Sequence, residues 1–230
     1  MARRTKEDAV ATRNSLLDAA EQVFYQKGVS HASLNEIAQA AGATRGAIYW
    51  HFKDKVDLFN AMMERVTLPL ERANGECESN EDMAPLQRMR GVIDLVLRNL
   101  AQDERMQRVF EIAFFRVEYV EELAGVRDRH IAACDAFRQQ LARDLHLAAD
   151  AQKLKLPMAP EIAAIALQAI FDGLVQGWIL NRANFDLPST GRASVDAYLR
   201  GLGLDLPPLP DWLQDCSLRS MCPHAVGAVP

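Results

Sequence analysis

The chain has 230 residues, 49% of them hydrophobic and 25% charged, and its formal net charge is −5. This composition is that of a folded soluble protein, so it excludes disorder of the whole chain. The longest apolar run, around residues 162–171, is about ten residues long and predicts no membrane-spanning segment. Charged residues follow the N-terminus where a signal peptide would need an apolar core, so we expect a cytoplasmic protein with no membrane partner.

The hydrophobic spacing is helical along the chain, and no sustained apolar–polar alternation predicts a strand. The first predicted helix ends at Gly28, and the segment Ser33-Leu-Asn-Glu36 is a capping box that begins the second. Gly42 ends that helix, and Thr44 can cap a third. The helices predicted in this part of the chain occupy residues 6–27, 33–41, 44–50 and a stretch that starts near residue 55.

The remaining chain is also predicted to be helical. A polar stretch at residues 74–82 predicts a loop, and several later boundaries are marked by prolines, namely Pro85, Pro157, Pro160 and Pro188. After Gly203 the chain holds five of its ten prolines, so we expect an irregular tail. The predicted helices here occupy residues 85–101, 104–121, 125–149, 160–182 and 191–204.

Two short helices joined by Gly42 and Ala43 have the spacing of a helix-turn-helix. Gly42 permits a sharp turn, and small residues on the facing sides let the helices approach closely. We expect the core beneath to be filled by Leu34, Ile37, Ile48 and Phe52. The outer face of the second helix carries side chains suited to phosphates and base edges, namely Thr44, Arg45, Tyr49, Trp50 and His51.

The run from Ala41 to Lys55, Ala-Gly-Ala-Thr-Arg-Gly-Ala-Ile-Tyr-Trp-His-Phe-Lys-Asp-Lys, resembles the DNA-binding domain of the TetR family of bacterial repressors. Segments 2–8, 111–112 and 172–174 are most similar to the AcrR/TtgR group of that family, which controls multidrug efflux pumps. The resemblance implies an all-α fold with a three-helix DNA-binding domain (residues 1–55), a larger ligand-binding and dimerisation domain (56–205) and an irregular tail (206–230).

The resemblance also implies which residues touch DNA. Thr44 and Arg45 match positions at the start of the recognition helix, and Gly46 lets the backbone approach the bases. Lys55 matches a phosphate-binding lysine at the start of the fourth helix, where the helix N-terminus adds positive potential. The full set of candidate DNA contacts is Arg3, Arg4, Lys6, Ser33, Thr44, Arg45, Gly46, Tyr49, Trp50, His51 and Lys55.

Other interpretations of these residues remain open. An aromatic pair followed by His is often packed in a core, and the basic N-terminus can be a solvated tail. A histidine metal site is disfavoured, because no two histidines are spaced i,i+4. The scattered cysteines predict neither a disulfide framework nor a zinc site, and no cofactor is expected; they are Cys77, Cys134, Cys216 and Cys222.

Methionine and phenylalanine recur at helical spacings in residues 56–205, which predicts either a well-packed core or an adaptable apolar cavity. The resemblance implies a drug-binding cavity, made more apolar here by Phe110 and Phe114, where relatives tend to carry polar residues. Asp172 is either a polar anchor in that cavity or an exposed or capping carboxylate. The candidate lining residues are Val66, Met89, Val92, Ile93, Val96, Phe110, Phe114, Phe137, Leu141, Gln168, Phe171, Asp172 and Gln176.

The expected assembly is a homodimer. Gly173 and Gly177 share one face of the predicted helix 160–182, where small residues let helices approach closely, although that face can equally pack within one subunit. No catalytic motif is present, so an enzyme is disfavoured. We expect a repressor that binds double-stranded operator DNA and is released by small apolar or aromatic inducers. A ligand-independent architectural DNA-binding protein and a repressor of a metabolic operon are the alternatives.

Overall fold

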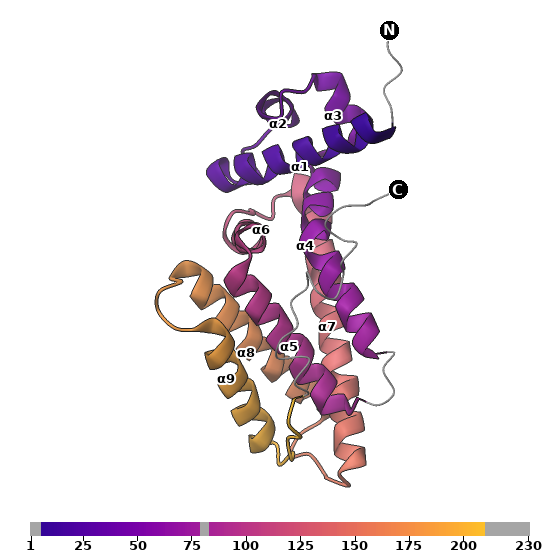
Figure 1. The fold of residues 1–230 in the computed structure, drawn as a ribbon, viewed down its shortest axis with the longest axis vertical. Helices are drawn as coiled ribbons and strands as arrows, with labels where there is room; N and C mark the ends of the chain where they lie inside the picture. Colours follow the sequence, from indigo (N-terminus) through magenta and orange to yellow (C-terminus); the bar gives the residue numbers. More distant parts are fainter. Residues whose placement is uncertain (1–5, 79–82, 210–230) are drawn as a thin grey trace. The chain divides into compact units, whose positions relative to one another are not determined.

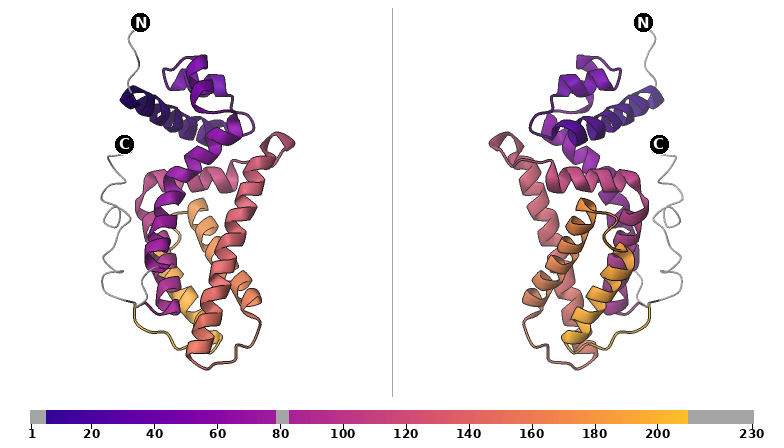
Figure 2. Two further views of the ribbon diagram at one scale, coloured as in Figure 1. Left: turned by 90° about the vertical axis from the view of Figure 1, so that its right-hand side faces the viewer. Right: turned by 90° about the vertical axis from the view of Figure 1, so that its left-hand side faces the viewer.

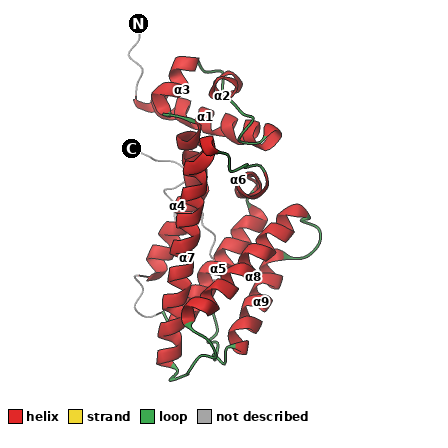
Figure 3. Cartoon of the chain, turned by 180° about the vertical axis from the view of Figure 1, so that it is seen from behind, coloured by secondary structure: helices red, strands yellow, loops and turns green. Residues whose placement is uncertain are grey.

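The computed structural model describes residues 6–78 and 83–209, together with the side chains of these residues except those of 69–78. Within these residues all regular structure is helical, as Figure 3 shows, which confirms the expected all-α class. Of the candidate DNA contacts, Arg3 and Arg4 lie outside the described residues, as does most of the expected tail. The chain divides into two compact units that interleave along the sequence.

The first unit contains the helix-turn-helix. Its three helices, α1 (Lys6–Lys27), α2 (Leu34–Ala40) and α3 (Arg45–His51), pack on one another at the N-terminal end of the chain (Figure 1). Ile37, Ile48 and Phe52 are almost completely buried, as predicted, and Leu34 is only half-buried. These apolar side chains hold α2 and α3 against α1.

The turn between α2 and α3 depends on a left-handed glycine. Gly42 has a φ of 64°, which side chains with a Cβ rarely adopt. The amide of Ala43 donates to the carbonyl of Ala38 (2.9 Å), and the amide of Gly42 donates to that of Gln39 (3.0 Å). This pair of bonds is a Schellman motif, which closes α2 and sends the chain into α3.

The first unit also includes elements that follow much later in the sequence. These are the first part of α4 (Lys55–Glu78), almost all of α6 (Glu104–Phe115), the short 3-10 helix η1 (Glu121–Leu123) and the start of α7 (Ala124–Ala151). The amide of Val29 donates to the carbonyl of Arg116 (2.8 Å), which joins the α1–α2 turn to the end of α6. The compact unit therefore extends past residue 55, and the predicted domain boundaries stay a prediction.

The second unit is built from α5 (Pro85–Gln102), the rest of α7, α8 (Pro160–Leu180) and α9 (Leu187–Gly201). Helix α9 packs against both α5 and α8, and the two views of Figure 2 show these helices side by side. A Cβ added to Gly191 of α9 would lie 2.2 Å from Cδ1 of the fully buried Leu97. The guanidinium of Arg90 donates two bonds to the carboxylate of Asp196 (2.7 and 2.8 Å), so a largely buried ion pair also joins α5 to α9.

Several predicted boundaries were wrong. Helix α4 continues to Glu78, into the stretch expected to be a loop, and α6 ends at Phe115 rather than near residue 121. Helix α9 begins earlier than expected, because the side chain of Asp186 accepts a bond from the amide of Ser189 (2.8 Å) and Pro188 fits the first turn.

The prediction that no apolar segment is long enough to cross a membrane was also wrong. By length and composition alone, α8 passes that test among the described residues, with a mean hydropathy of 1.5 over its most apolar window. The ten-residue run was an underestimate because it was taken to end at Asp172. The chain stays largely apolar from there to Leu180, with Asp172 as the single added charge. Of that window, 39% is buried inside the structure, and the core helix of a soluble protein passes the same test.

Candidate nucleic-acid interface and ligand-binding residues

Helix α3 is fixed at both ends by local bonds. The Thr44 hydroxyl accepts a hydrogen bond from the amide of Ala47 (3.2 Å), which caps the first turn. The amide of Phe52 donates to the carbonyl of Ile48 (2.9 Å) and closes the last turn. Ala47 and Ile48 point into the core, so the opposite face of this two-turn helix is directed to solvent.

That opposite face is aromatic and basic. Tyr49 is 49% exposed and Trp50 is 72% exposed, which excludes the alternative that the pair packs in the core. The Arg45 guanidinium lies 5.7 Å from the centre of the Tyr49 ring, a cation–π contact that orients both side chains. The half-buried His51 ring meets the Trp50 ring edge to face at 4.5 Å. Arg45, Gly46, Tyr49 and Trp50 therefore form one exposed surface around the capping Thr44.

The N-terminus of α2 is organised by a complete capping box. The Ser33 hydroxyl accepts from the amide of Glu36 (3.2 Å), and the Glu36 carboxylate accepts from the amide of Ser33 (3.0 Å). The Lys27 ammonium donates to the same carboxylate at 2.6 Å. The bond from Lys27, followed by those from Ser33, lowers the pKa of Glu36 to about 2. Ser33 is exposed at this fixed helix end, and Lys6 is exposed at the start of α1.

Lys55 differs from the other candidate DNA contacts because its side chain is only 9% exposed. Its ammonium donates to the carbonyls of Ser30 (2.9 Å) and Ala32 (3.1 Å), and it forms an ion pair with Glu122 at 3.2 Å. An ammonium has three N–H donors, and three protein oxygens surround this one. A phosphate bond from Lys55 stays a prediction, and in this arrangement it requires one of the three oxygens to leave.

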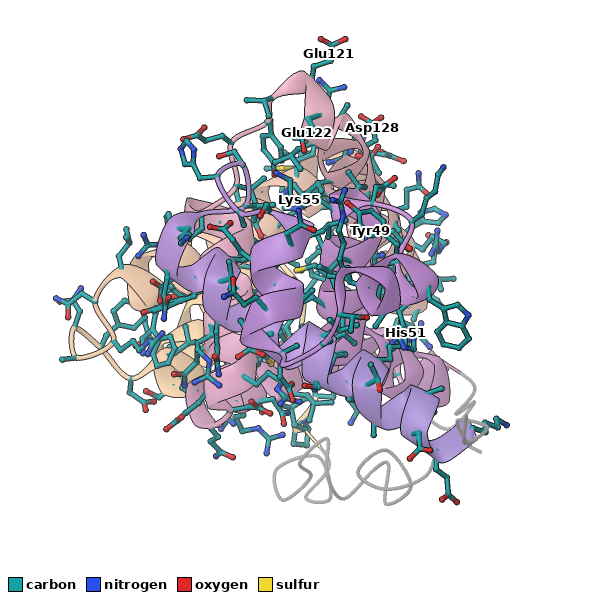
Figure 4. All side chains as sticks on the ribbon, turned by 90° about the horizontal axis from the view of Figure 1, so that it is seen from above. Tyr49, His51, Lys55, Glu121, Glu122 and Asp128 are labelled. Atoms are coloured by element: carbon teal, nitrogen blue, oxygen red, sulfur yellow. The ribbon has the colours of Figure 1, made fainter. Side chains whose placement is uncertain are left out.

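A shallow groove crosses this part of the first unit. Its walls include Ser33 at the start of α2, Tyr49 of α3 and Lys53 just after α3. Lys55 and Glu122 lie in the same groove. Figure 4, which views the structure of Figure 1 from above, labels these two side chains and Tyr49. Positive and hydrogen-bonding groups predicted to meet DNA thus share one surface with two acidic side chains, Asp54 beside Lys55 and Glu122 from η1.

The predicted ligand-binding residues fall into two groups, one in each compact unit. In the first unit, the Phe110 and Phe114 rings lie 5.9 Å apart on α6 and both side chains are half-buried. In the second, the Phe137 ring of α7 lies 5.6 Å from the Phe171 ring of α8. The first group also includes Val66. The second group also includes Met89, Val92, Ile93, Val96, Leu141, Gln168, Asp172 and Gln176. A single cavity formed by both groups stays a prediction.

Asp172 and Gln168 lie near a cysteine that the sequence did not single out. Asp172 is half-buried in the middle of α8, which argues against the alternative of a capping or fully exposed carboxylate. Burial first, and then the negative charge of Asp172, raises the pKa of Cys134 on α7. The signal that could have found Cys134 is its i,i+3 spacing to Phe137, which places both on one face of the helix.

Comparisons with known proteins cover both compact units. The model of bacterial regulatory proteins of the tetR family matches residues 16–62, and that of the C-terminal region of MAATS-type transcriptional repressors matches residues 84–204. The chain is 36% identical over 195 residues to the HTH-type transcriptional regulator AcrR of Shigella flexneri, covering 85% of this chain and 91% of that protein. It is 34% identical over 206 residues to the HTH-type transcriptional regulator TtgR of Pseudomonas putida, covering 90% and 96%.

Solved structures give the same result. Native NalD, the secondary repressor of the MexAB-OprM multidrug efflux pump in Pseudomonas aeruginosa, matches with a TM-score of 0.76 and 37% identity, over 85% of this chain and 98% of NalD. SmeT, the repressor of the Stenotrophomonas maltophilia multidrug efflux pump SmeDEF, was solved as a complex with triclosan. That complex matches with a TM-score of 0.73 and 30% identity, over 87% of this chain and 99% of SmeT.

Proposed function

Because the chain belongs to the TetR family of bacterial transcriptional regulators, we propose that it represses a multidrug efflux operon and leaves its operator when it binds a small molecule. The observation that carries this proposal is the exposed face of α3, where Arg45, Tyr49 and Trp50 stand in solvent on a helix capped by Thr44. The efflux target is supported by the relatives, which include regulators named for multidrug pumps. The protein is a regulator rather than an enzyme.

The mechanism is a population shift. A dimer that binds DNA holds its two recognition helices about 34–36 Å apart, one turn of the duplex. An inducer that binds better to a different spacing moves the equilibrium away from DNA by its differential affinity and no further. Helices α4 and α7 each have residues in both compact units. We therefore propose that these two helices transmit the effect of inducer binding to the recognition helices.

Operator binding is tested with Arg45→Ala and Lys53→Ala. Both side chains are exposed, and one lies on the recognition helix while the other follows it. Loss of a bidentate base contact in Arg45→Ala is expected to cost about 1–3 kcal/mol at one base pair and to relax discrimination against scrambled DNA. Lys53→Ala is expected to weaken operator and scrambled DNA equally, because phosphate contacts carry no sequence information. If Arg45→Ala, like Lys53→Ala, weakens binding to operator and to scrambled DNA by the same factor, base recognition by Arg45 is rejected.

The homodimer is proposed from the exposed side of α8. Ile162 is 56% exposed, Ile165 is 54% exposed and Leu180 is 70% exposed, which is a large apolar surface to leave in water. A Cβ added at Gly173 or Gly177 of the same helix meets no other atom within 4 Å, so a larger side chain fits one protomer. A second copy covering this face explains both features.

Gly177→Glu is therefore expected to give a folded monomer with much weaker operator affinity, because one half-site cannot hold the complex. The matched control is Ala133→Glu, which adds the same carboxylate to an exposed position of α7. Analytical ultracentrifugation measures the mass of each variant. A wild-type monomer that still binds operator tightly would reject the dimer proposal.

Inducer binding is proposed to use the aromatic side chains of α6, α7 and α8. Phe114→Ala is expected to raise the inducer concentration needed for release while leaving operator affinity without inducer unchanged. Phe115→Ala, at the neighbouring 38% exposed ring, is the matched control. Asp172→Asn is expected to weaken a cationic compound such as N-methylacridinium more than the neutral triclosan. Equal weakening of both compounds would reduce Asp172 to a structural role.

Release by these compounds also separates the alternatives. An architectural DNA-binding protein would stay on DNA in the presence of every compound, and its affinity would not differ between operator and scrambled sequence. A metabolic repressor would be released by metabolites and not by drug-like compounds. The net charge of −5 disfavours the architectural alternative.

A further inference from the structure

The segment that joins α6 to α7, residues 116–125, is bonded to the turn between α1 and α2. The carbonyl of Arg116 accepts from the amide of Val29 at 2.8 Å. The Glu118 carboxylate accepts from the Ser30 hydroxyl at 3.2 Å. We call this segment the α6–α7 corner. Its attachment to the α1–α2 turn does not depend on the side chain of η1 that reaches Lys55.

That side chain is Glu122, and it completes the surroundings of the buried Lys55 ammonium. Two of the three partners are the backbone carbonyls of Ser30 and Ala32, which belong to the α1–α2 turn and hold the ammonium in place. The third is the Glu122 carboxylate, at 3.2 Å, on a side chain that is 67% exposed. An exposed carboxylate can rotate into solvent at little cost. The third bond of Lys55 is therefore the exchangeable one.

The carboxylate also stands where it opposes DNA. Glu122 lines the same groove as Ser33, Tyr49 and Lys53, so a phosphate entering that groove meets a negative charge beside the buried ammonium. Figure 4 shows Glu122 on the side of η1 that faces Lys55, and Glu121 at the tip of the corner pointing away from it. Two adjacent residues of one short helix thus carry the same charge in different surroundings.

We propose that Glu122 is an internal competitor of the DNA phosphate for Lys55 and lowers the affinity of the free protein for DNA. This inference rests on the proposed binding of DNA by α3. Binding then exchanges one anion for another at a fixed ammonium, so the buried charge is never left unpaired, which would be costly. The carboxylate acts through Lys55, so Glu122 is a positioning residue and does not itself contact DNA. The affinity of the repressor is thereby set by a residue of the α6–α7 corner.

The test compares Glu122→Gln with Glu121→Gln in the full-length protein. Both variants remove one negative charge from η1, and only the first removes the competitor. Glu122→Gln is expected to strengthen binding roughly three- to sixfold per DNA-bound protomer, because the fraction of protein with Lys55 available rises. The slope of log affinity against log salt is expected to steepen by up to about 0.9 per protomer. Glu121→Gln is expected to change both quantities much less.

The gain in Glu122→Gln is expected to be equal on operator and scrambled DNA, because a phosphate contact carries no sequence information. In a Lys55→Met background the two glutamine substitutions are expected to have the same small effect. If Lys55→Met does not fold, the salt slopes of the two single variants decide. Equal affinities and slopes for the single variants, or weaker binding by Glu122→Gln, overturn the inference while DNA binding stands. No binding of any DNA by the wild type overturns the proposed function, and this inference with it.

Discussion

Replacing Gly46 by Ala should change the stability of the free protein and its affinity for DNA in opposite directions. Gly46 is the second residue of α3 and is exposed. An added Cβ would have the Thr44 Oγ1 atom as its nearest neighbour, at 4.0 Å, which is an ordinary contact. Alanine is favoured over glycine in a helix, so we expect the free energy of unfolding to rise by about 0.5–1 kcal/mol.

The same methyl group stands on the face expected to meet DNA. Gly46 is flanked by Thr44 and Arg45, which are both exposed and predicted to touch the duplex. A methyl that keeps the backbone away from the bases removes contacts worth about 1–3 kcal/mol, which corresponds to a roughly 5- to 150-fold weaker operator complex. The variant is thus expected to be more stable and less active.

Urea unfolding followed by circular dichroism measures the first quantity, and fluorescence anisotropy with labelled operator measures the second. The control is Gly201→Ala, which adds a methyl to another exposed helical glycine with no atom within 4 Å. It is expected to leave operator affinity unchanged. If Gly46→Ala gains stability and keeps full operator affinity, the duplex does not approach the backbone of α3 at this position.

Three further substitutions test the packing and the charges. Gly191→Ala is expected to lose about 1–3 kcal/mol in unfolding free energy through overpacking against the fully buried Leu97, and an unchanged urea midpoint would contradict this. Asp196→Ala is expected to lose about 3–5 kcal/mol, because the buried Arg90 guanidinium loses its bidentate partner, and a loss below 1 kcal/mol would show the pair to be solvated. The pKa of Glu36 is lowered to about 2, so its contribution to stability is complete above pH 4.5 and disappears as the pH falls toward 2. The stability difference between wild type and Glu36→Gln should therefore shrink over that range, and a constant difference would reject the ion pair as its cause.

The recognition helix was predictable from the sequence because local bonds define it. The Ser33–Glu36 capping box and the Thr44 cap join residues three apart, and each appears in the structure with its expected partner. The exposure of Tyr49 and Trp50 followed from helical geometry, since Ile48 already occupies the inward position. Residues three or four apart on a helix lie on the same face, so their spacing in the sequence predicts which side chains share a surface.

The boundary errors show where local signals compete. Pro188 suggested a helix boundary, and the cap formed by Asp186 instead placed this proline in the first turn of α9. Helix α6 ends at Phe115 although the helical pattern of the sequence continues to residue 121. There the carbonyl of Arg116 accepts a bond from the amide of Val29, a partner that no spacing within α6 could indicate.

The surroundings of the charged groups were decided only by the tertiary structure. Lys55 was predicted to bind phosphate, and the fold surrounds its ammonium with two carbonyls of the α1–α2 turn and Glu122. Arg90 and Asp196 stand 106 residues apart and form a bidentate pair. The period of a helix predicts which face a side chain occupies, but it does not predict which distant element packs on that face. The sequence by itself therefore determined the family, the helices and the exposed side of α3, while the partners of its buried charges depend on contacts that form only when distant segments pack together.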